Sequence, residues 1–240
     1  MILVTDDDGY TEGAEILLEV AKEFDSAYGL FPEKQKSAVS VALTLHKALR
    51  IRKPKNDVWT VSGTPADAVL FSVYSKEFIT PKLVLSGINA GDNCAVSSFL
   101  SSGTIGACWK ATLEGIPSIA FSKYISPENW GKGNKWKQKE EIKDVLRKVI
   151  KKLIKKKKKD VFYNVSIPEV IKKPKIVFVK KPQRLRFKAT ITKRKDPNGI
   201  PYYWLSGNFR EIKKGTDLHE LAVKKNVVIT PVHLTFSERV

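Results

Sequence analysis

The sequence predicts an α/β fold, with a Rossmann-like parallel sheet between two layers of helices and a C-terminal β-hairpin extension. Two observations lead to this prediction. Over residues 1–121, strand-length apolar runs alternate with segments of helical spacing, which is typical of a parallel sheet with helices on both faces. The apolar runs are continuous rather than alternating, which favours strands that are buried on both sides.

The first half of the chain supplies the core elements in order. Met1–Thr5 is a short apolar run, and helical spacing follows over Glu12–Phe24. Thr64 and Pro65 have the residue types of an N-cap and a first helical position, so a helix is expected to begin there. Another helix is expected from about Thr104 to Glu114. The remaining strands are predicted at Ala27–Phe31, Val58–Val61, Leu83–Ser86 and Ser118–Phe121.

The second half begins with a lysine-rich amphipathic helix. Apolar residues between Ile142 and Ile154 recur at spacings of three and one, which form one stripe on a helix, and the lysines occupy the other face. Lys155 to Lys159 are expected to close this helix, because the helix dipole favours cations at its C-terminus. Asp196 to Gly199 have the chemistry of a hairpin turn. Strands are predicted at Phe162–Val165, Lys175–Val179, Phe187–Thr192, Tyr202–Leu205 and Val227–Thr230.

The length of 240 residues fits a single domain, which we divide into an α/β core (1–130) and a region with the lysine-rich helix, the β-hairpin and the C-terminal strand (131–240). The net charge is +18, but residues 1–130 carry 12 basic and 15 acidic side chains. The basic excess therefore belongs to the second half. A solvated helix face explains the lysine-rich block over residues 132–159, and a surface that binds nucleic acid or another polyanion is the alternative that we do not favour.

The sequence also predicts a cytoplasmic protein. No apolar run approaches the roughly 20 residues of a membrane helix, so no membrane association is expected. The N-terminal residues run directly into acidic ones, without the basic region and cleavage site of a signal peptide. Cys94 and Cys108 form no metal or redox motif, and two reduced thiols are typical of a cytosolic chain.

Asp6, Asp7 and Asp8, followed by Gly9, are the most informative residues. Three adjacent carboxylates after a buried strand repel one another unless a cation compensates them, and oxygen ligands suit hard ions such as Mg²⁺. Gly9 allows a sharp turn into the helix. On this loop alone, an acidic turn that caps the following helix is an equal alternative.

Two further polar loops follow predicted strands, and in a parallel sheet such loops meet at one edge. Ser37 offers a hydroxyl oxygen after the second strand, and Asn89 offers an amide oxygen in a Gly-rich turn. Ser102, Gly103 and Thr104 open a helix whose free N–H groups could hold a phosphate. Each motif alone is explained by an ordinary turn, and their joint placement is what indicates a metal and phosphate site.

These motifs, together with later ones, closely resemble the SurE survival-protein family of 5′/3′-nucleotidases. The resemblance covers nearly the whole chain in order, and the segment Leu100–Thr104 is most similar to the archaeal branch. Its segments are Met1–Gly9, Pro32–Ser37, Gly63–Asp67, Ser86–Gly91, Ser102–Ile119, Asn164–Pro168, Tyr202–Leu205 and Gly215–Asp217.

The resemblance implies a phosphatase that acts on nucleoside 5′-monophosphates and, as a second class, 3′-monophosphates. It implies one divalent ion per subunit, Mg²⁺ or Mn²⁺, and a homodimer or homotetramer. The catalytic residues would be Asp7 and Asp8. The implied metal ligands are Asp7, Asp8, Ser37 and Asn89, and the implied phosphate-binding residues are Ser102, Gly103 and Thr104.

The chain departs from the family pattern at two positions. Asp6 stands where the family usually has Asn, and Ala38 stands where it generally has Gly. Two mechanisms stay open, namely attack by a metal-bound water and a covalent aspartyl-phosphate. A non-catalytic Rossmann-like protein that binds nucleotides or RNA is the alternative function.

Other polar residues are assigned structural or surface roles. The three histidines have no ligand spacing between them. Asp67 and Asp217 are expected to hold loops or subunit contacts. Lys180, Arg184 and Arg186 could reach a phosphate, and a surface role explains them equally well.

Overall fold

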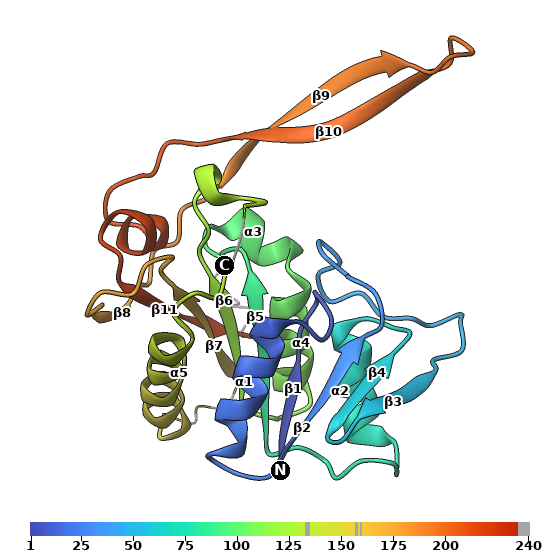
Figure 1. Cartoon of the computed structure of the whole chain (residues 1–240), viewed down its shortest axis with the longest axis vertical. Helices are drawn as coiled ribbons and strands as arrows, with labels where there is room; N and C mark the ends of the chain where they lie inside the picture. Colours follow the sequence, from blue (N-terminus) through green and yellow to red (C-terminus); the bar gives the residue numbers. More distant parts are fainter. Residues whose placement is uncertain (133–134, 157, 159, 235–240) are drawn as a thin grey trace, which may run out of the picture.

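A nine-stranded sheet with helices on both faces forms the body of the computed structural model, which describes residues 1–132, 135–156, 158 and 160–234 (Figure 1). Neighbouring strands run parallel in the order β4-β2-β1-β5-β6-β7. Strand β3 pairs antiparallel with β4, and β11 pairs antiparallel with β7. The predicted α/β/α architecture is therefore confirmed. In sheet order the strands are β3 (Ile51–Lys55), β4 (Val58–Val61), β2 (Ala27–Pro32), β1 (Ile2–Thr5), β5 (Leu83–Ala90), β6 (Ser118–Lys123), β7 (Val161–Ile167), β11 (Val227–His233) and β8 (Ile176–Phe178).

Two helices cover each face of the sheet. Helices α1 (Glu12–Lys22) and α5 (Lys139–Ile154) pack in one apolar cluster, while α2 (Pro65–Tyr74) and α4 (Gly103–Leu113) border the other. The predicted stripe of α5 is buried, as shown by Ile142, Val145, Leu146, Val149, Ile150 and Leu153. The helix ends at Ile154, so of the expected closing lysines only Lys155 caps it; Lys157 and Lys159 lie outside the described residues.

Strand β3 was not predicted from the sequence. It has the sequence Ile-Arg-Lys-Pro-Lys and is exposed along most of its length, so it lacks the apolar run that marks the buried strands. Its proline is tolerated because β3 is an edge strand, where one missing N–H costs no ladder bond. The short helices α3 (Val96–Ser101), η1 (Pro127–Asn129) and η2 (His219–Val223) were also missed.

Strand β5 is longer than predicted, and this corrects the expected Gly-rich turn around Asn89. The strand runs to Ala90 and pairs with β6 again at Asn89 after a register shift that follows Ser86. Gly87 is needed for a close approach between strands, because a Cβ there would lie 2.2 Å from the carbonyl oxygen of Phe121. Asn89 is thus held by a sheet rather than by a free loop.

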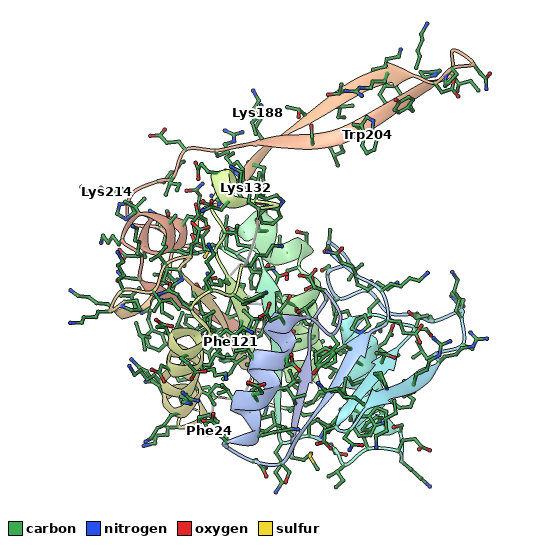
Figure 2. All side chains as sticks on the ribbon, viewed as in Figure 1. Phe24, Phe121, Lys132, Lys188, Trp204 and Lys214 are labelled. Carbon is green, nitrogen blue, oxygen red and sulfur yellow. The ribbon has the colours of Figure 1, made fainter. Side chains whose placement is uncertain are left out.

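The predicted hairpin is present as β9 (Phe187–Lys195) and β10 (Pro201–Phe209), which pair only with each other among the described strands. Its turn is closed by Asp196, which accepts hydrogen bonds from the backbone N–H groups of Asn198 and Ile200. The hairpin extends away from the body, and Figure 2 shows Trp204 and Lys188 standing off its ribbon. Trp204 is 61% exposed and Leu205 is 76% exposed.

Two buried aspartates hold loops, as predicted. Asp67 accepts hydrogen bonds from the N–H groups of Thr64 and Thr44 and so completes a capping box at the start of α2. Asp217 accepts from the N–H groups of Ala95 and Gln183. Among the described residues, the structure contains no helix that is long and apolar enough to span a bilayer.

Candidate active site

The acidic loop lies directly after β1, at the carboxyl edge of the sheet. Asp6 and Asp7 are buried and Asp8 is half-buried. The loop is fixed by the loop that follows the neighbouring strand β2, because the N–H of Lys36 donates to the carbonyl oxygen of Asp7 at 2.7 Å. Gly9 has a φ of +85°, which accounts for glycine at this turn. The loop therefore does not cap the following helix; the side chain of Thr11 does.

Asp7 is held against the N-terminus of α4. One carboxylate oxygen accepts a hydrogen bond from the N–H of Gly103 at 3.1 Å, and the other accepts from the hydroxyl of Thr104 at 2.5 Å. The approach is close, since a Cβ on Gly103 would lie 2.7 Å from the Cβ of Asp7. Ser102 caps the helix by accepting from the N–H of Ile105. The N-terminus of α4 thus orients a carboxylate, with which the helix dipole interacts favourably.

Asp8 and Ser37 share a hydrogen-bond donor that sequence reasoning missed. The amide nitrogen of Gln35 lies 2.8 Å from Oδ1 of Asp8 and 2.9 Å from Oγ of Ser37. Ser37 itself lies 3.4 Å from the same carboxylate oxygen. Ala38 follows with a φ of +59°, a left-handed conformation, which explains why a glycine suits this position. No sequence pattern distinguished Gln35 from an ordinary loop residue.

Asn89 reaches the site from the end of β5. Its amide nitrogen donates to the carbonyl oxygen of Gly91 at 2.7 Å, which leaves the amide oxygen as the candidate ligand atom. All four predicted metal ligands line a single cleft. That cleft also contains Ser102, whereas Gly103 and Thr104 lie behind Asp7 and do not line it. The assignment of phosphate binding to those two residues therefore stays a prediction.

Burial and the neighbouring carboxylates disfavour the charged forms of Asp6 and Asp7. Burial raises the pKa of Asp6 well above its usual range, and the charges of Asp7 and Asp8 raise it further. Burial also raises the pKa of Asp7, against the hydrogen bond from Thr104, which lowers it. Oδ2 of Asp6 has no hydrogen-bond partner within the part of the chain that the structure describes. A bound cation would relieve this repulsion.

The donor set fits a hard divalent ion. It comprises two carboxylates and two neutral oxygens, from Asp7, Asp8, Ser37 and Asn89, and oxygen donors are those that Mg²⁺ and Mn²⁺ prefer. Among the described residues there is no group of three or more His, Cys, Asp and Glu side chains that could hold a metal ion. A metal site here would therefore need the hydroxyl of Ser37 and the amide oxygen of Asn89. None of the three histidines lines the cleft.

The lining of the cleft also includes aromatic side chains and a buried cation. Arg186 is buried and its guanidinium lies 3.3 Å from the carboxylate of Asp92. Phe187 and Phe209 lie beside this guanidinium, and Trp130 lines the same cleft. The surface role considered for Arg186 is therefore wrong, while Lys180 and Arg184 are exposed and do not line the cleft.

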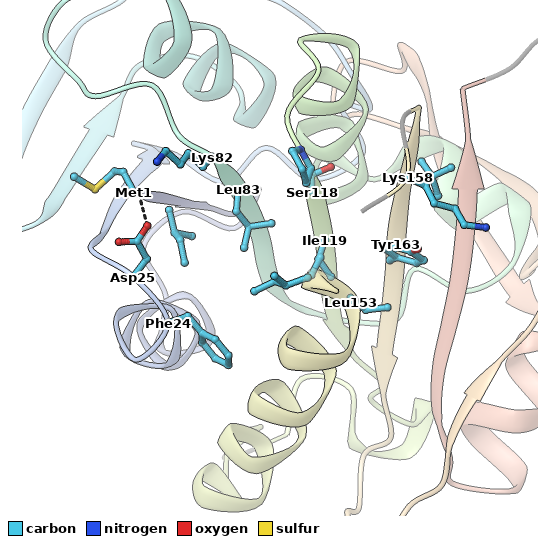
Figure 3. Close-up of a pocket in the computed structure, with 14 residues that line it drawn as sticks. Met1, Phe24, Asp25, Lys82, Leu83, Ser118, Ile119, Leu153, Lys158 and Tyr163 are labelled. Atoms are coloured by element: carbon cyan, nitrogen blue, oxygen red, sulfur yellow. Dashed lines mark hydrogen bonds and ion pairs between the residues drawn. The ribbon is translucent and has the colours of Figure 1, made fainter. Parts of the chain in front are cut away.

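A second hollow lies at the opposite edge of the sheet, by the amino ends of β1, β5, β6 and β7 (Figure 3). Apolar side chains such as Leu83, Ile119 and Leu153 line much of it. Asp25, the one carboxylate among its described lining residues, is paired with the amino group of Met1 at 2.5 Å. Its described lining residues supply no set of oxygen ligands like that of the cleft at the carboxyl edge.

Comparison with known proteins gives one family. The model described as "Survival protein SurE" matches residues 2–189. The chain is 38% identical over 239 residues to the 5′-nucleotidase SurE of Thermofilum pendens, across 98% of this chain and 90% of that protein. It is 36% identical to the 5′-nucleotidase SurE of Hyperthermus butylicus, across 97% of this chain and 84% of that protein. The solved structure of the SurE protein from Aquifex aeolicus matches with a TM-score of 0.81 at 32% identity, over 99% of this chain and 94% of that one.

Proposed function

The chain belongs to the SurE survival protein family, and from that membership we propose that it is a metal-dependent 5′-nucleotidase. It would hydrolyse nucleoside 5′-monophosphates to a nucleoside and phosphate, with 3′-monophosphates as a second substrate class. The observation that carries the proposal is the convergence of Asp7, Asp8, Ser37 and Asn89 in one cleft at the carboxyl edge of the sheet.

Each proposed ligand has a support that fixes its position. Asp7, Asp8, Ser37 and Asn89 would hold one Mg²⁺ or Mn²⁺ ion, which when bound polarises a phosphoryl oxygen and lowers the pKa of a coordinated water. Asp7 is oriented by α4, Gln35 orients Asp8 and Ser37, and β5 carries Asn89. Ser102 lines the cleft at the start of α4, where a phosphate would interact favourably with the helix dipole.

The geometry bears on the two open mechanisms. Both oxygens of Asp7 already accept hydrogen bonds from α4, and the side chain is buried. Asp8 is more exposed, and its Oδ1 accepts a hydrogen bond from the side chain of Gln35. If a covalent aspartyl-phosphate forms, we therefore assign it to Asp8, and Asp7 stays a metal ligand in both routes.

Metal removal tests the proposed function. We expect phosphate release from AMP and GMP in the presence of Mn²⁺ or Mg²⁺, loss of release with EDTA, and recovery when the ion is restored in excess. Malachite-green detection of phosphate measures this directly. Undiminished release in EDTA would contradict the metal requirement. Nucleotide binding without release under all ions would favour the non-catalytic alternative, in which the basic second half binds nucleotides or RNA.

We also propose a homodimer or homotetramer. A two-stranded hairpin is marginally stable alone in water, and this one exposes Ile191, Tyr203, Trp204 and Leu205. A second copy of the chain would cover these side chains. Light scattering is expected to give a multiple of 27.0 kDa, and a Trp204→Ser, Leu205→Ser variant should shift the mass towards a monomer. A wild-type mass of one chain at tens of micromolar would overturn this.

A cytoplasmic location completes the proposal. Cys94 and Cys108 are both buried and unpaired, as expected of a chain that folds in a reducing compartment. Cell fractionation with a cytosolic marker measures this, and recovery outside the cytosolic fraction would contradict it.

A further inference from the structure

The cleft is larger than a phosphate and a metal ion require. Its volume is about 690 Å³, which is within the roughly 300–1,000 Å³ that is typical of sites for whole small ligands. The acidic loop supplies part of its lining. Trp130, Phe187 and Phe209, which we call the aromatic wall, supply another part. A substrate group that extends beyond the phosphate would therefore meet aromatic side chains rather than carboxylates.

Trp130 of the aromatic wall packs beside a proposed metal ligand. Its indole edge rests on Gly91, where an added Cβ would lie 3.1 Å from Cη2 of the ring and 3.8 Å from the amide nitrogen of Asn89. The backbone of Gly91 in turn accepts the hydrogen bond from Asn89. The indole is thus docked on a glycine two residues after a proposed ligand, while 59% of the Trp130 surface stays exposed.

The other two rings are fixed at the root of the hairpin. Phe187 and Phe209 face each other across β9 and β10, with ring centroids 4.7 Å apart. The guanidinium of Arg186 lies 4.8 Å from the Phe209 ring. The N–H of Arg186 donates to the hydroxyl of Ser97, which ties the root to α3. Because Asp92 balances the charge of Arg186, this cation supports the rings rather than offering a free charge.

Three partly exposed rings in one cleft form a surface for a flat, aromatic group. Exposed apolar patches on a protein surface often mark binding sites. Any nucleobase can stack on aromatic side chains, because every base has a π-face. The ammonium group of Lys135 lies 5.9 Å from the centroid of the Trp130 ring, so a cation also borders the aromatic wall. Aliphatic phosphate esters would leave the aromatic wall in contact with water.

We infer that Trp130 stacks against the nucleobase of the substrate, in the cleft that Phe187 and Phe209 also line. The inference rests on the proposed nucleotidase function and adds to it the means by which a nucleotide is preferred over other phosphate monoesters. Loss of one base-stacking ring costs between about fivefold and a hundredfold in affinity. Stacking without base-specific hydrogen bonds implies weak discrimination among AMP, GMP, CMP and UMP.

The test compares two substrates that share a phosphoribosyl group. Trp130→Ala should lower kcat/KM for AMP by about tenfold or more and leave kcat/KM for ribose 5-phosphate within about twofold. Trp130→Phe keeps a ring and should restore most of the activity with AMP. Tyr74→Ala is the matched control, because Tyr74 is an exposed aromatic residue outside the cleft, and it should leave both values unchanged.

Adenosine binding provides a readout that does not need hydrolysis. Adenosine should quench tryptophan fluorescence of the wild type, and the quenching should disappear in Trp130→Phe. An equal loss for AMP and ribose 5-phosphate in Trp130→Ala, or an unchanged ratio, would overturn the stacking role while leaving the nucleotidase proposal intact. A wild type that hydrolyses neither substrate with Mn²⁺ would instead remove the proposed function, and this inference with it.

Discussion

The substitution Asp7→Asn should abolish nucleotidase activity, with kcat/KM for AMP falling on the order of a thousandfold or more. The substitution removes the charge of a buried carboxylate that is proposed to hold the metal ion, but it keeps the size of the side chain. Both donors from α4, the N–H of Gly103 and the hydroxyl of Thr104, now face an uncharged amide. Steady-state kinetics over a Mn²⁺ titration measure the loss and show whether excess ion restores any of it.

The adjacent variant Asp6→Asn is the matched control. It makes the same chemical change one residue away, in a side chain that does not line the cleft. An asparagine oxygen can still accept from the N–H of Asp7, as Oδ1 of Asp6 does, and the family pattern usually has asparagine here. We expect activity within a few-fold of wild type. Near-normal turnover by Asp7→Asn, or an equal loss in both variants, would contradict the assignment of Asp7 as a ligand.

The same Asp6→Asn variant should stabilise the metal-free protein as the pH rises. The pKa of Asp6 is raised in the folded state, so folding favours its protonated form, and this contribution is lost as the pH rises through that pKa. Asparagine cannot ionise, and the loss disappears. Thermal melts should therefore show a larger gain for Asp6→Asn at pH 8 than at pH 4.

The core of the fold could be predicted because its signals are local. A buried parallel strand such as β1 reads as a continuous apolar run, and α5 reads as an apolar stripe. Strand β3 has neither signal, since it is polar and gains its place only by pairing with β4. The length of β5 was also missed, because Gly87 suggests a turn in the sequence but serves a close approach to β6 in the structure.

The proposed metal site followed from topology, and the rest of the cleft did not. Asp7 and Ser37 follow β1 and β2, and Asn89 lies near the end of β5. These three strands are neighbours in the sheet, and parallel strands bring their carboxyl ends together. Gln35 and Trp130 carry no such signal. Each acts through contacts with residues distant in the sequence, namely Asp8 for Gln35 and Gly91 for Trp130. Arg186 read as one basic residue among many, and only the packing around it shows that it is buried.

The substitution Gly103→Ala tests whether the start of α4 positions Asp7. A Cβ there would lie 2.7 Å from the Cβ of Asp7 and 3.1 Å from the carbonyl oxygen of Lys36. Neither neighbour is the free end of a flexible side chain, so the carboxylate or the helix must move. A displacement of about 1 Å at a reacting centre can cost on the order of a hundredfold in rate. We expect kcat/KM for AMP to fall by about that factor, together with a lower melting temperature.

Gly115→Ala separates this effect from general destabilisation. Gly115 lies just beyond the C-terminus of the same helix, with a φ of +75° and no other atom within 4 Å of an added Cβ. Alanine there strains the backbone and should lower stability by roughly 1 kcal/mol. It cannot push on Asp7, so activity at 25 °C should be unchanged. If both variants lose activity in proportion to their melting temperatures, stability and not the position of Asp7 governs the result. If Gly103→Ala is fully active, the contact between α4 and the acidic loop does not set the geometry of the site.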